Sequence, residues 1–108
     1  MSAPNSSECI FCKIISGVIP AQKIYEDVDF IAFNDIKPMA KIHFLIVPKA
    51  HVESLKDCNQ LHQAMLGKAL LLAPNLAAEK GLIGFKILIN TGKEGGQEVF
   101  HLHLHVIS

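Results

Sequence analysis

The chain has 108 residues, of which half are hydrophobic and 19% are charged, a composition that suits one folded domain and excludes a disordered chain. Ten basic and ten acidic side chains cancel, which argues against a nucleic-acid partner, and no apolar run approaches the roughly 20 residues that span a bilayer, which argues against a membrane partner. Residues 1–7 are small and polar without the architecture of a signal peptide, so we expect a flexible N-terminal tail, a folded domain over 8–108 and a cytoplasmic location.

The first predicted element is a short helix over residues 8–15, where apolar side chains recur at helical spacing before Ser16 and Gly17. It carries Cys9 and Cys12. Because three cysteines cannot form a closed disulfide framework, this pair favours a metal clip over a disulfide, although two packed thiols remain an alternative.

Four short runs predict strands. Lys23–Glu26 and Phe30–Asn34 indicate a hairpin, whereas His43–Val47 and Phe85–Asn90 are apolar and indicate buried central strands. Between these two pairs, a capping box formed by Asp57 and Gln60 predicts the start of a long helix. Pro74 lies inside the helical pattern and predicts a kink or a break.

The last predicted strand, Val99–Ile107, alternates histidine with apolar residues, so His101, His103 and His105 stand about 6.6 to 7 Å apart on one face. A polar solvent face or a simple metal-binding strip is as compatible with this pattern as catalysis is. The elements together predict an α+β fold of about five antiparallel strands, covered on one face by a helix.

The run from His101 to Ile107 resembles the complete motif of the histidine-triad (HIT) family, in which three histidines alternate with apolar residues. Further segments are similar to the Hint branch of that family: Cys9–Ile15, Ile19–Ala21, Tyr25–Asp27, Ala32–Pro38, His43–Lys49 and Gly95–Gln97. The resemblance implies the HIT fold, with one long and one short helix, a sheet extended across a two-fold homodimer, and attack on the α-phosphorus of a nucleotide.

The same resemblance implies three catalytic residues. His103 matches the nucleophile, a role that a neutral imidazole can perform by forming a labile phosphoramidate. His105 matches a supporting residue that contacts phosphate, and His43 matches a histidine beside the phosphate. For His43 a hydrogen-bonded core histidine is the alternative.

The implied nucleotide-binding residues come from several loops. Asp35 would accept hydrogen bonds from the ribose hydroxyls, and Asn90 and Gln97 would offer side-chain amides near the phosphate. The base would lie in a pocket involving Ile24, Phe33 and Ile36. The whole implied set is Asp35, Ile36, Asn90, Gln97, Val99, His103 and His105; an exposed turn aspartate and a plain turn asparagine are the alternatives for Asp35 and Asn90.

The metal clip is completed by resemblance as well, since relatives hold zinc at positions that match Cys9, Cys12, His51 and His101. Two thiolates and two imidazoles are a sufficient ligand set for a closed, tetrahedral structural Zn²⁺. Because such an ion would be structural, the reaction itself would need no cofactor. Four metal-free side chains are the alternative.

These features predict hydrolysis of the P–N bond in purine (adenosine) nucleoside 5′-phosphoramidates through a nucleotidyl-His103 intermediate. The alternatives are a dinucleoside polyphosphate hydrolase or nucleotidyl transferase, and a non-enzymatic nucleotide-binding or scaffold protein. Glu98 and the end of the sequence at Ser108 depart from the Hint pattern and leave base preference and leaving group open.

Overall fold

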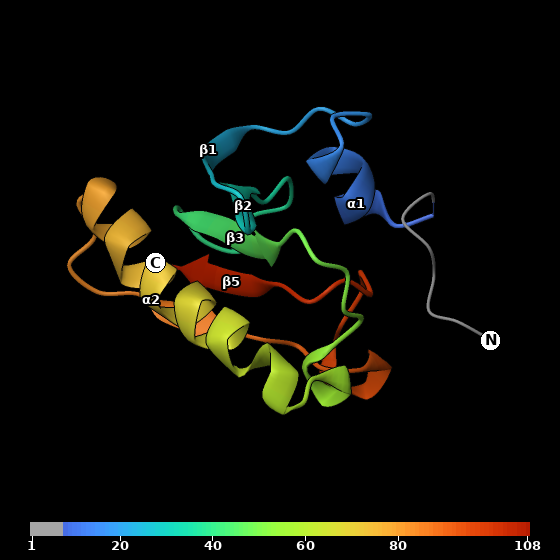
Figure 1. Cartoon of the computed structure of the whole chain (residues 1–108). Helices are drawn as coiled ribbons and strands as arrows, with labels where there is room; N and C mark the ends of the chain where they lie inside the picture. The colour runs from blue at the N-terminus through green and yellow to red at the C-terminus, as the bar shows by residue number, and fades with distance from the viewer. Residues whose placement is uncertain (1–7) are drawn as a thin grey trace.

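The computed structural model describes residues 8–108, so the predicted tail over residues 1–7 lies outside the described part of the chain. Five strands form one antiparallel sheet in the order β1-β2-β3-β5-β4 (Figure 1). Their bounds are β1 Lys23–Glu26, β2 Phe30–Asn34, β3 His43–Pro48, β4 Lys86–Leu88 and β5 Leu104–Ile107. The predicted α+β fold is confirmed, and β1 and β2 have the predicted bounds.

Two α-helices accompany the sheet: the short α1, Ile10–Ile15, and the long α2, Gln63–Glu79. Single 3-10 turns lie at Leu55–Asp57, Gln60–His62 and Lys93–Gly95. Within the described range 8–108, no helix is both long and apolar enough to cross a membrane.

The approach to α2 differs from the prediction. The capping box is formed by Asn59 and His62 rather than by Asp57 and Gln60, because the Asn59 side chain accepts from the backbone while its own N–H donates to His62.

The break predicted at Pro74 is also wrong, since α2 continues through this residue. Buried residues on either side of Pro74, Ala73 and Leu76, pack this turn of the helix against the sheet and offset the lost backbone hydrogen bond.

Two strand predictions need correction. The strand predicted over Phe85–Asn90 is not central. β4 has only three residues and lies at an edge of the sheet, and its first and last residues, Lys86 and Leu88, are exposed. The strand predicted over Val99–Ile107 begins only at Leu104. The segment before it leaves the sheet, because the Leu102 N–H donates to the carbonyl of Val52 at 2.7 Å instead of to a neighbouring strand.

Strand alternation divides the core into two clusters on opposite faces of the sheet. Phe44, Ile46 and Leu104 point toward α2 and pack with buried helix residues such as Ala73. Residues of the opposite parity, for example Leu45, pack with α1. Figure 1 shows α1 and α2 on opposite sides of the sheet. By the same parity His43, His103 and His105 belong to the α1 face, where the short helix leaves room for polar groups.

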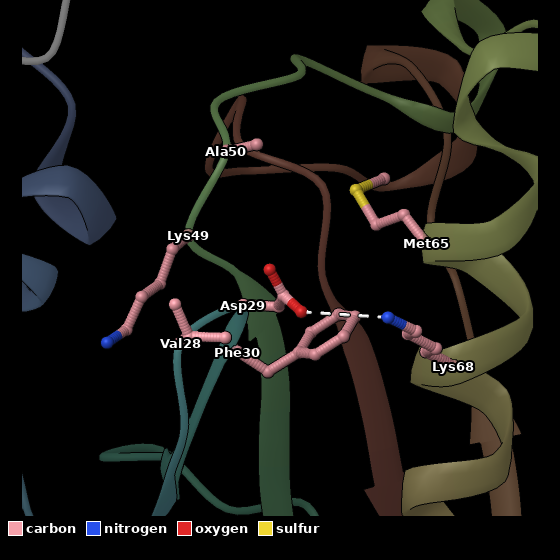
Figure 2. Close-up of a pocket in the computed structure, with 7 residues that line it drawn as sticks. All are labelled: Val28, Asp29, Phe30, Lys49, Ala50, Met65 and Lys68. Atoms are coloured by element: carbon pink, nitrogen blue, oxygen red, sulfur yellow. Dashed lines mark ion pairs between the residues drawn. The ribbon is translucent and has the colours of Figure 1, made fainter.

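A surface cavity of about 520 Å³ lies between the β1–β2 turn and the first half of α2 (Figure 2). Phe30 is part of its lining, and an ion pair of 3.8 Å between Lys68 and Asp29 crosses it. No lining residue is a histidine or a cysteine, so the cavity is separate from the groups that the sequence analysis singled out.

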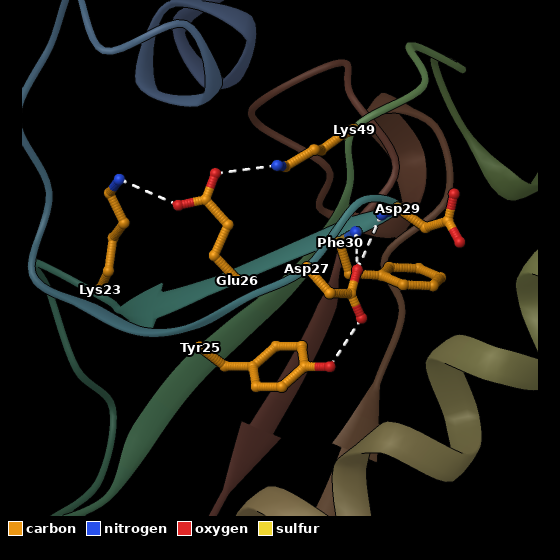
Figure 3. Close-up of polar contacts among 7 residues, drawn as sticks. All are labelled: Lys23, Tyr25, Glu26, Asp27, Asp29, Phe30 and Lys49. Carbon is orange, nitrogen blue, oxygen red and sulfur yellow. Dashed lines mark hydrogen bonds and ion pairs between the residues drawn. The ribbon is translucent and has the colours of Figure 1, made fainter.

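The β1–β2 turn is fixed by Asp27 (Figure 3). Its carboxylate accepts the backbone N–H groups of Asp29 and Phe30, each at 2.7 Å, and the Tyr25 hydroxyl at 2.6 Å. These contacts lower the pKa of Asp27, with the Tyr25 hydrogen bond as the largest cause. The turn thereby holds β1 in register with β2, whose first residue, Phe30, pairs with Pro48 at the end of β3 opposite His43.

Candidate active site and metal centre

Four of the six histidines lie in two neighbouring clusters on the α1 face. One cluster joins His51 and His101 to the two cysteines of α1. The other joins His43 and His105 to Asp35. His103 lies between the two clusters. Its ring centroid is 4.9 Å from that of His105, and its Nδ1 is hydrogen-bonded to the backbone carbonyl of His101.

The Cys–His cluster brings together all four predicted zinc ligands. Cys9 Sγ lies 3.3 Å from His101 Nδ1, Cys12 Sγ lies 3.4 and 3.6 Å from the Nδ1 atoms of His51 and His101, and these two nitrogens are 3.1 Å apart. A tetrahedral zinc with ordinary bond lengths separates sulfur from nitrogen by about 3.6 Å and nitrogen from nitrogen by about 3.3 Å. These four separations are therefore close to those of a zinc site, and all four donor atoms lie within 4.8 Å of one another.

The hydrogen bonds of the cluster also suit a metal. The Nε2–H of His101 donates to the carbonyl of Pro48 at 2.7 Å, so the lone pair of this neutral ring is on Nδ1, facing the two sulfurs. His51 also turns Nδ1 inward, and its buried Nε2 has no partner among the described residues. Cys9 caps α1, where its sulfur accepts the Cys12 N–H at 3.3 Å, so the helix start holds both sulfurs in place.

Without a metal the Cys12 thiol resists ionisation. Burial, and then the adjacent Cys9, raises the pKa of Cys12 to about 11. Two buried thiols next to two imidazoles contribute little stability by themselves, whereas a divalent cation would replace the thiol protons and bind all four groups. The donor set fits structural Zn²⁺.

The structure fixes one tautomer of His103. Its Nδ1–H donates to the carbonyl of His101 at 2.6 Å, and since a carbonyl can only accept, the lone pair is on Nε2. His103 is 7% exposed, and this burial lowers its pKa, which keeps the imidazole neutral. Phe11 packs edge-on against the ring at a centroid distance of 5.0 Å and restricts its rotation. A neutral imidazole with a fixed, free lone pair is a nucleophile.

The second cluster is a chain of hydrogen bonds that begins at the backbone of Met39. The Met39 N–H donates to His43 Nδ1 at 3.0 Å, so neutral His43 carries its own proton on Nε2. That atom lies 2.9 Å from His105 Nδ1 and 3.3 Å from Asp35 Oδ2. Burial, with neighbouring His103 and His43, lowers the pKa of His105 to about 4, so His105 is neutral as well.

The second cluster has the composition of a metal site, two histidines and one carboxylate, but its protons are in the wrong places for one. A metal needs a lone pair on His43 Nε2, and the Met39 N–H holds the lone pair on Nδ1 instead. The two clusters therefore serve different purposes. In the Cys–His cluster the nitrogen lone pairs face inward, as a metal requires. In the second cluster His43 donates a hydrogen bond to His105.

The remaining predicted residues surround these clusters in different ways. Ile36 is 92% exposed, beside Asp35. Asn90 follows β4 and lies against the loop glycine Gly96, and Val99 packs against the α1-side core. The predicted base pocket is only partly assembled, since Phe33 belongs to this core whereas Ile24 packs on the α2 side.

Gln97 differs from its prediction. Its side-chain amide donates to the carbonyls of Glu53 and Val99 at 2.6 and 3.0 Å and accepts the Gly92 N–H at 2.8 Å. No amide hydrogen remains for a phosphate in this arrangement. Gln97 instead fastens the glycine-containing loop to the chain that follows β3.

Sequence reasoning missed two contributors to the site. Phe11 is one of the apolar side chains of the predicted short helix, and it touches both His101 and His103. Its position between the two cysteines is the signal that could have found it. The Met39 N–H is a backbone group that orients His43, and no feature of the residue type indicates that role.

Comparisons with known proteins agree with this arrangement. The family described as "Scavenger mRNA decapping enzyme C-term binding" matches residues 8–108. The chain is 54% identical over 100 residues to "Protein HitA" of Neisseria gonorrhoeae, covering 92% of this chain and 94% of that protein.

Solved structures also match over most of the chain. A HIT family hydrolase from Legionella pneumophila is 42% identical, with a TM-score of 0.92 and coverage of 94% of this chain and 92% of that one. A histidine triad family protein from Mycobacterium smegmatis, described as zinc-bound, is 39% identical, with a TM-score of 0.82 and coverage of 95% and 76%.

Proposed function

The chain belongs to the histidine-triad family of nucleotide-binding hydrolases, and from that premise we propose that it hydrolyses the P–N bond of purine, chiefly adenosine, nucleoside 5′-phosphoramidates. His103 is the nucleophile of this reaction. The observation that carries the proposal is the hydrogen bond from His103 Nδ1–H to the His101 carbonyl, which leaves Nε2 free for attack.

The reaction consists of two displacements at the α-phosphorus. His103 Nε2 forms a bond to phosphorus as the P–N bond to the leaving amine breaks, and the amine takes up a proton. Water then forms a P–O bond as the bond to His103 breaks, gives up a proton, and releases the nucleoside monophosphate. The attack needs a neutral imidazole, which the lowered pKa of His103 supplies, and the proton that the amine takes up in the first step is balanced by the one that water gives up in the second.

Neighbouring groups support the phosphate and the nucleoside. His105, when its Nδ1 accepts from His43, presents its Nε2–H as a donor to a phosphate oxygen. Asp35 has a partly exposed carboxylate that suits ribose hydroxyls, and the exposed Ile36 next to it suits one face of the base. Asn90 and Val99 complete the proposed binding set, while Gln97 supports their loop.

Single-turnover labelling with adenosine 5′-phosphoramidate, radiolabelled in the phosphate, tests the nucleophile. Wild-type protein should give a nucleotidyl adduct, and His103→Ala should give none. His62→Gln is the matched control, because His62 lies in the 3-10 turn before α2 and contacts neither cluster. An adduct that persists in His103→Ala would exclude His103 as the nucleophile.

The leaving group requires a separate comparison. We expect the phosphoramidate to be cleaved faster than a diadenosine polyphosphate. The reverse order would replace the proposed activity with polyphosphate hydrolysis or nucleotidyl transfer. Turnover of both substrates equal to that of His103→Asn would indicate a nucleotide-binding or scaffold protein.

Zinc has a structural role in this proposal. Cys9, Cys12, His51 and His101 would fill all four positions of a tetrahedral ion, leaving none for an activated water. When bound, the ion would join α1 to the segment before β5. The chemistry then depends on His103 and its neighbours without a further cofactor.

A homodimer is part of the proposal. β4 is an edge strand that carries one exposed charge, Lys86, beside the partly exposed apolar side chains of Phe85 and Leu88, whereas the other edge, β1, carries two charges, Lys23 and Glu26, that discourage pairing. The β4 edge is therefore the side at which the sheet would continue across a two-fold axis. Sedimentation at micromolar concentration should give twice the 11.8 kDa chain mass, and a monomeric mass would contradict it. The cytoplasmic location remains a prediction.

A further inference from the structure

The four proposed zinc ligands differ in how far the protein encloses them. Cys9 and Cys12 are buried, and His101 is 0% exposed. His51 is the one member of the Cys–His cluster that is only partly buried. A side chain at the edge of the solvent can leave a metal centre without opening the core, and a small molecule can reach the position that it leaves.

The ligands also differ in the hydrogen bonds that orient them. Cys9 Sγ accepts the Cys12 N–H at 3.3 Å, and the His101 Nε2–H donates to the Pro48 carbonyl at 2.7 Å. A histidine bound to a metal almost always donates its other ring N–H in this way, and loss of such a contact costs roughly 10- to 100-fold in metal affinity. His51 Nε2 has no hydrogen-bond partner in the part of the chain that the structure describes. The fold therefore orients His101 and leaves His51 without that support.

This difference makes the two histidines unequal as ligands. When Nδ1 of either ring binds a metal, the ring proton is on Nε2. In His51 this N–H is buried without an acceptor among the described residues, which costs free energy, and rotation of the ring toward solvent removes that cost. In His101 the same rotation would break the hydrogen bond to Pro48. His51 is therefore the histidine that leaves the metal more easily.

The backbone on either side of His51 is fixed. The Lys49 N–H donates to the Asp29 carbonyl at 2.8 Å, and the Val52 carbonyl accepts the Leu102 N–H at 2.7 Å. These two hydrogen bonds do not depend on the direction in which the His51 ring points. Departure of the ring is therefore a side-chain movement that needs no refolding of the segment after β3.

We propose that His51 is the exchangeable ligand of the metal centre, so that an external imidazole can take its position while Cys9, Cys12 and His101 stay bound. This inference rests on the zinc site of the proposed function and adds to it, because a centre with one exchangeable position can bind a ligand as well as support the fold. Imidazole nitrogen is a donor that zinc accepts, and the position already holds an imidazole ring. The expected ligand is a small, unhindered imidazole.

Cobalt titration compares the two histidines. The full chain is titrated with Co²⁺ after removal of bound zinc, because the visible absorption of Co²⁺ distinguishes a tetrahedral ion bound by sulfur and nitrogen from the free ion. His51→Gly should bind Co²⁺ at least about 10-fold more tightly than His101→Gly, because only His101 has the supporting hydrogen bond. The two variants are matched, since each lacks one imidazole of the same cluster.

Added imidazole provides a second readout in the same variants. It should restore the wild-type Co²⁺ absorption and affinity in His51→Gly, because glycine leaves room for the ring at a partly exposed position. It should not do so in His101→Gly, since that position is fully buried. His62→Gln is the control, because His62 lies in the 3-10 turn before α2 and outside the cluster; it should bind Co²⁺ as wild type does.

Wild-type protein provides the test if His101→Gly does not fold. With ¹¹³Cd in place of zinc, scalar couplings between the metal and the ring protons identify each histidine that is bound. Excess imidazole should abolish the coupling to the His51 ring and leave the coupling to the His101 ring intact. Couplings to both rings that persist in imidazole would contradict the inference.

The possible failures are distinguishable. If wild-type protein gives no tetrahedral Co²⁺ absorption, the zinc site is wrong and the inference falls with it. If wild-type protein binds Co²⁺ but the two histidine variants lose equal affinity, or imidazole restores neither of them, only the present inference is overturned. A chain that passes these metal tests but forms no nucleotidyl adduct would overturn the proposed hydrolysis and leave the exchangeable ligand standing.

Discussion

Replacing Phe11 by leucine should lower both the stability of the protein and the reactivity of His103. The Phe11 ring is 6% exposed and makes three edge contacts, with ring centroids 5.0 Å from His103, 5.5 Å from Phe33 and 5.9 Å from His101. Leucine keeps most of the apolar volume but removes these contacts. At roughly 0.5 to 1.5 kcal/mol for each of the three aromatic pairs, the free energy of unfolding should fall by about 1.5 to 4.5 kcal/mol.

The kinetic effect follows from the position of the His103 ring. Its Nδ1 is held by the His101 carbonyl, and Phe11 limits rotation of the ring about its bond to the backbone. Without that contact the ring should spend time in orientations from which Nε2 does not face phosphorus. Since misplacement of a reacting group by about 1 Å can cost on the order of 100-fold, we expect adduct formation to slow by about 10-fold or more.

Denaturant unfolding measures the first effect, and rapid-quench single-turnover labelling measures the second. Phe30→Leu is the matched control: Phe30 is also buried, at 2% exposure, but it lies in the α2-side core. It should lose stability without a change in the rate of adduct formation per folded molecule. Equal rates in the two variants would refute the role of Phe11 in positioning His103.

Three further predictions concern metal, pH and the helix. Elemental analysis should find one zinc per chain, and chelation should lower the Tm by more than about 5 °C while activity persists in the folded fraction; loss of activity before loss of fold would contradict a purely structural zinc. Because the folded-state pKa of His105 is about 4, below its ordinary 6.5, the unfolded chain binds the additional proton, so stability is complete above pH 6.5 and declines as the pH falls toward 4. Unfolding curves between pH 6.5 and 5 should show a smaller pH slope in His105→Gln, and equal slopes would argue against this origin. Pro74→Ala should raise the free energy of unfolding by about 1 to 3 kcal/mol, because it restores a backbone donor inside α2, and an unchanged or lower value would show that the helix is already adapted to the proline.

Local sequence patterns were sufficient to predict the elements that are stabilised by residues nearby in the chain. The turn at Asp27 accounts for the bounds of β1 and β2, since its carboxylate bonds to groups two and three residues away. The alternation of histidine with apolar residues likewise placed His103 and His105 on the same side of the chain, because side chains of a strand alternate whether or not the strand is long. The residue types of the zinc cluster were sufficient to identify it as a set of candidate ligands.

The tertiary structure decided what depends on groups distant in sequence. Cys9 and His101 are 92 residues apart and meet only after folding, and the same meeting draws His101 and His103 out of the strand that the alternation predicted. Gln97, expected at the phosphate, is committed to three backbone groups, one of which, the Glu53 carbonyl, lies 44 residues away in the chain. Residue types cannot reveal these partners, because each hydrogen bond depends on where the backbone of another segment lies.

The sequence by itself therefore determined which residues could perform the chemistry, and the tertiary structure decided the state in which each one is held. A neutral histidine can carry its ring proton on either of two nitrogens, and the sequence does not say which. Three partners remove that freedom: the Pro48 carbonyl directs the His101 lone pair toward the sulfurs, the His101 carbonyl directs the His103 lone pair outward, and the Met39 N–H directs the His43 proton toward His105 and Asp35. All three are backbone groups, whose positions are fixed by the fold and not by the side chains that accompany them.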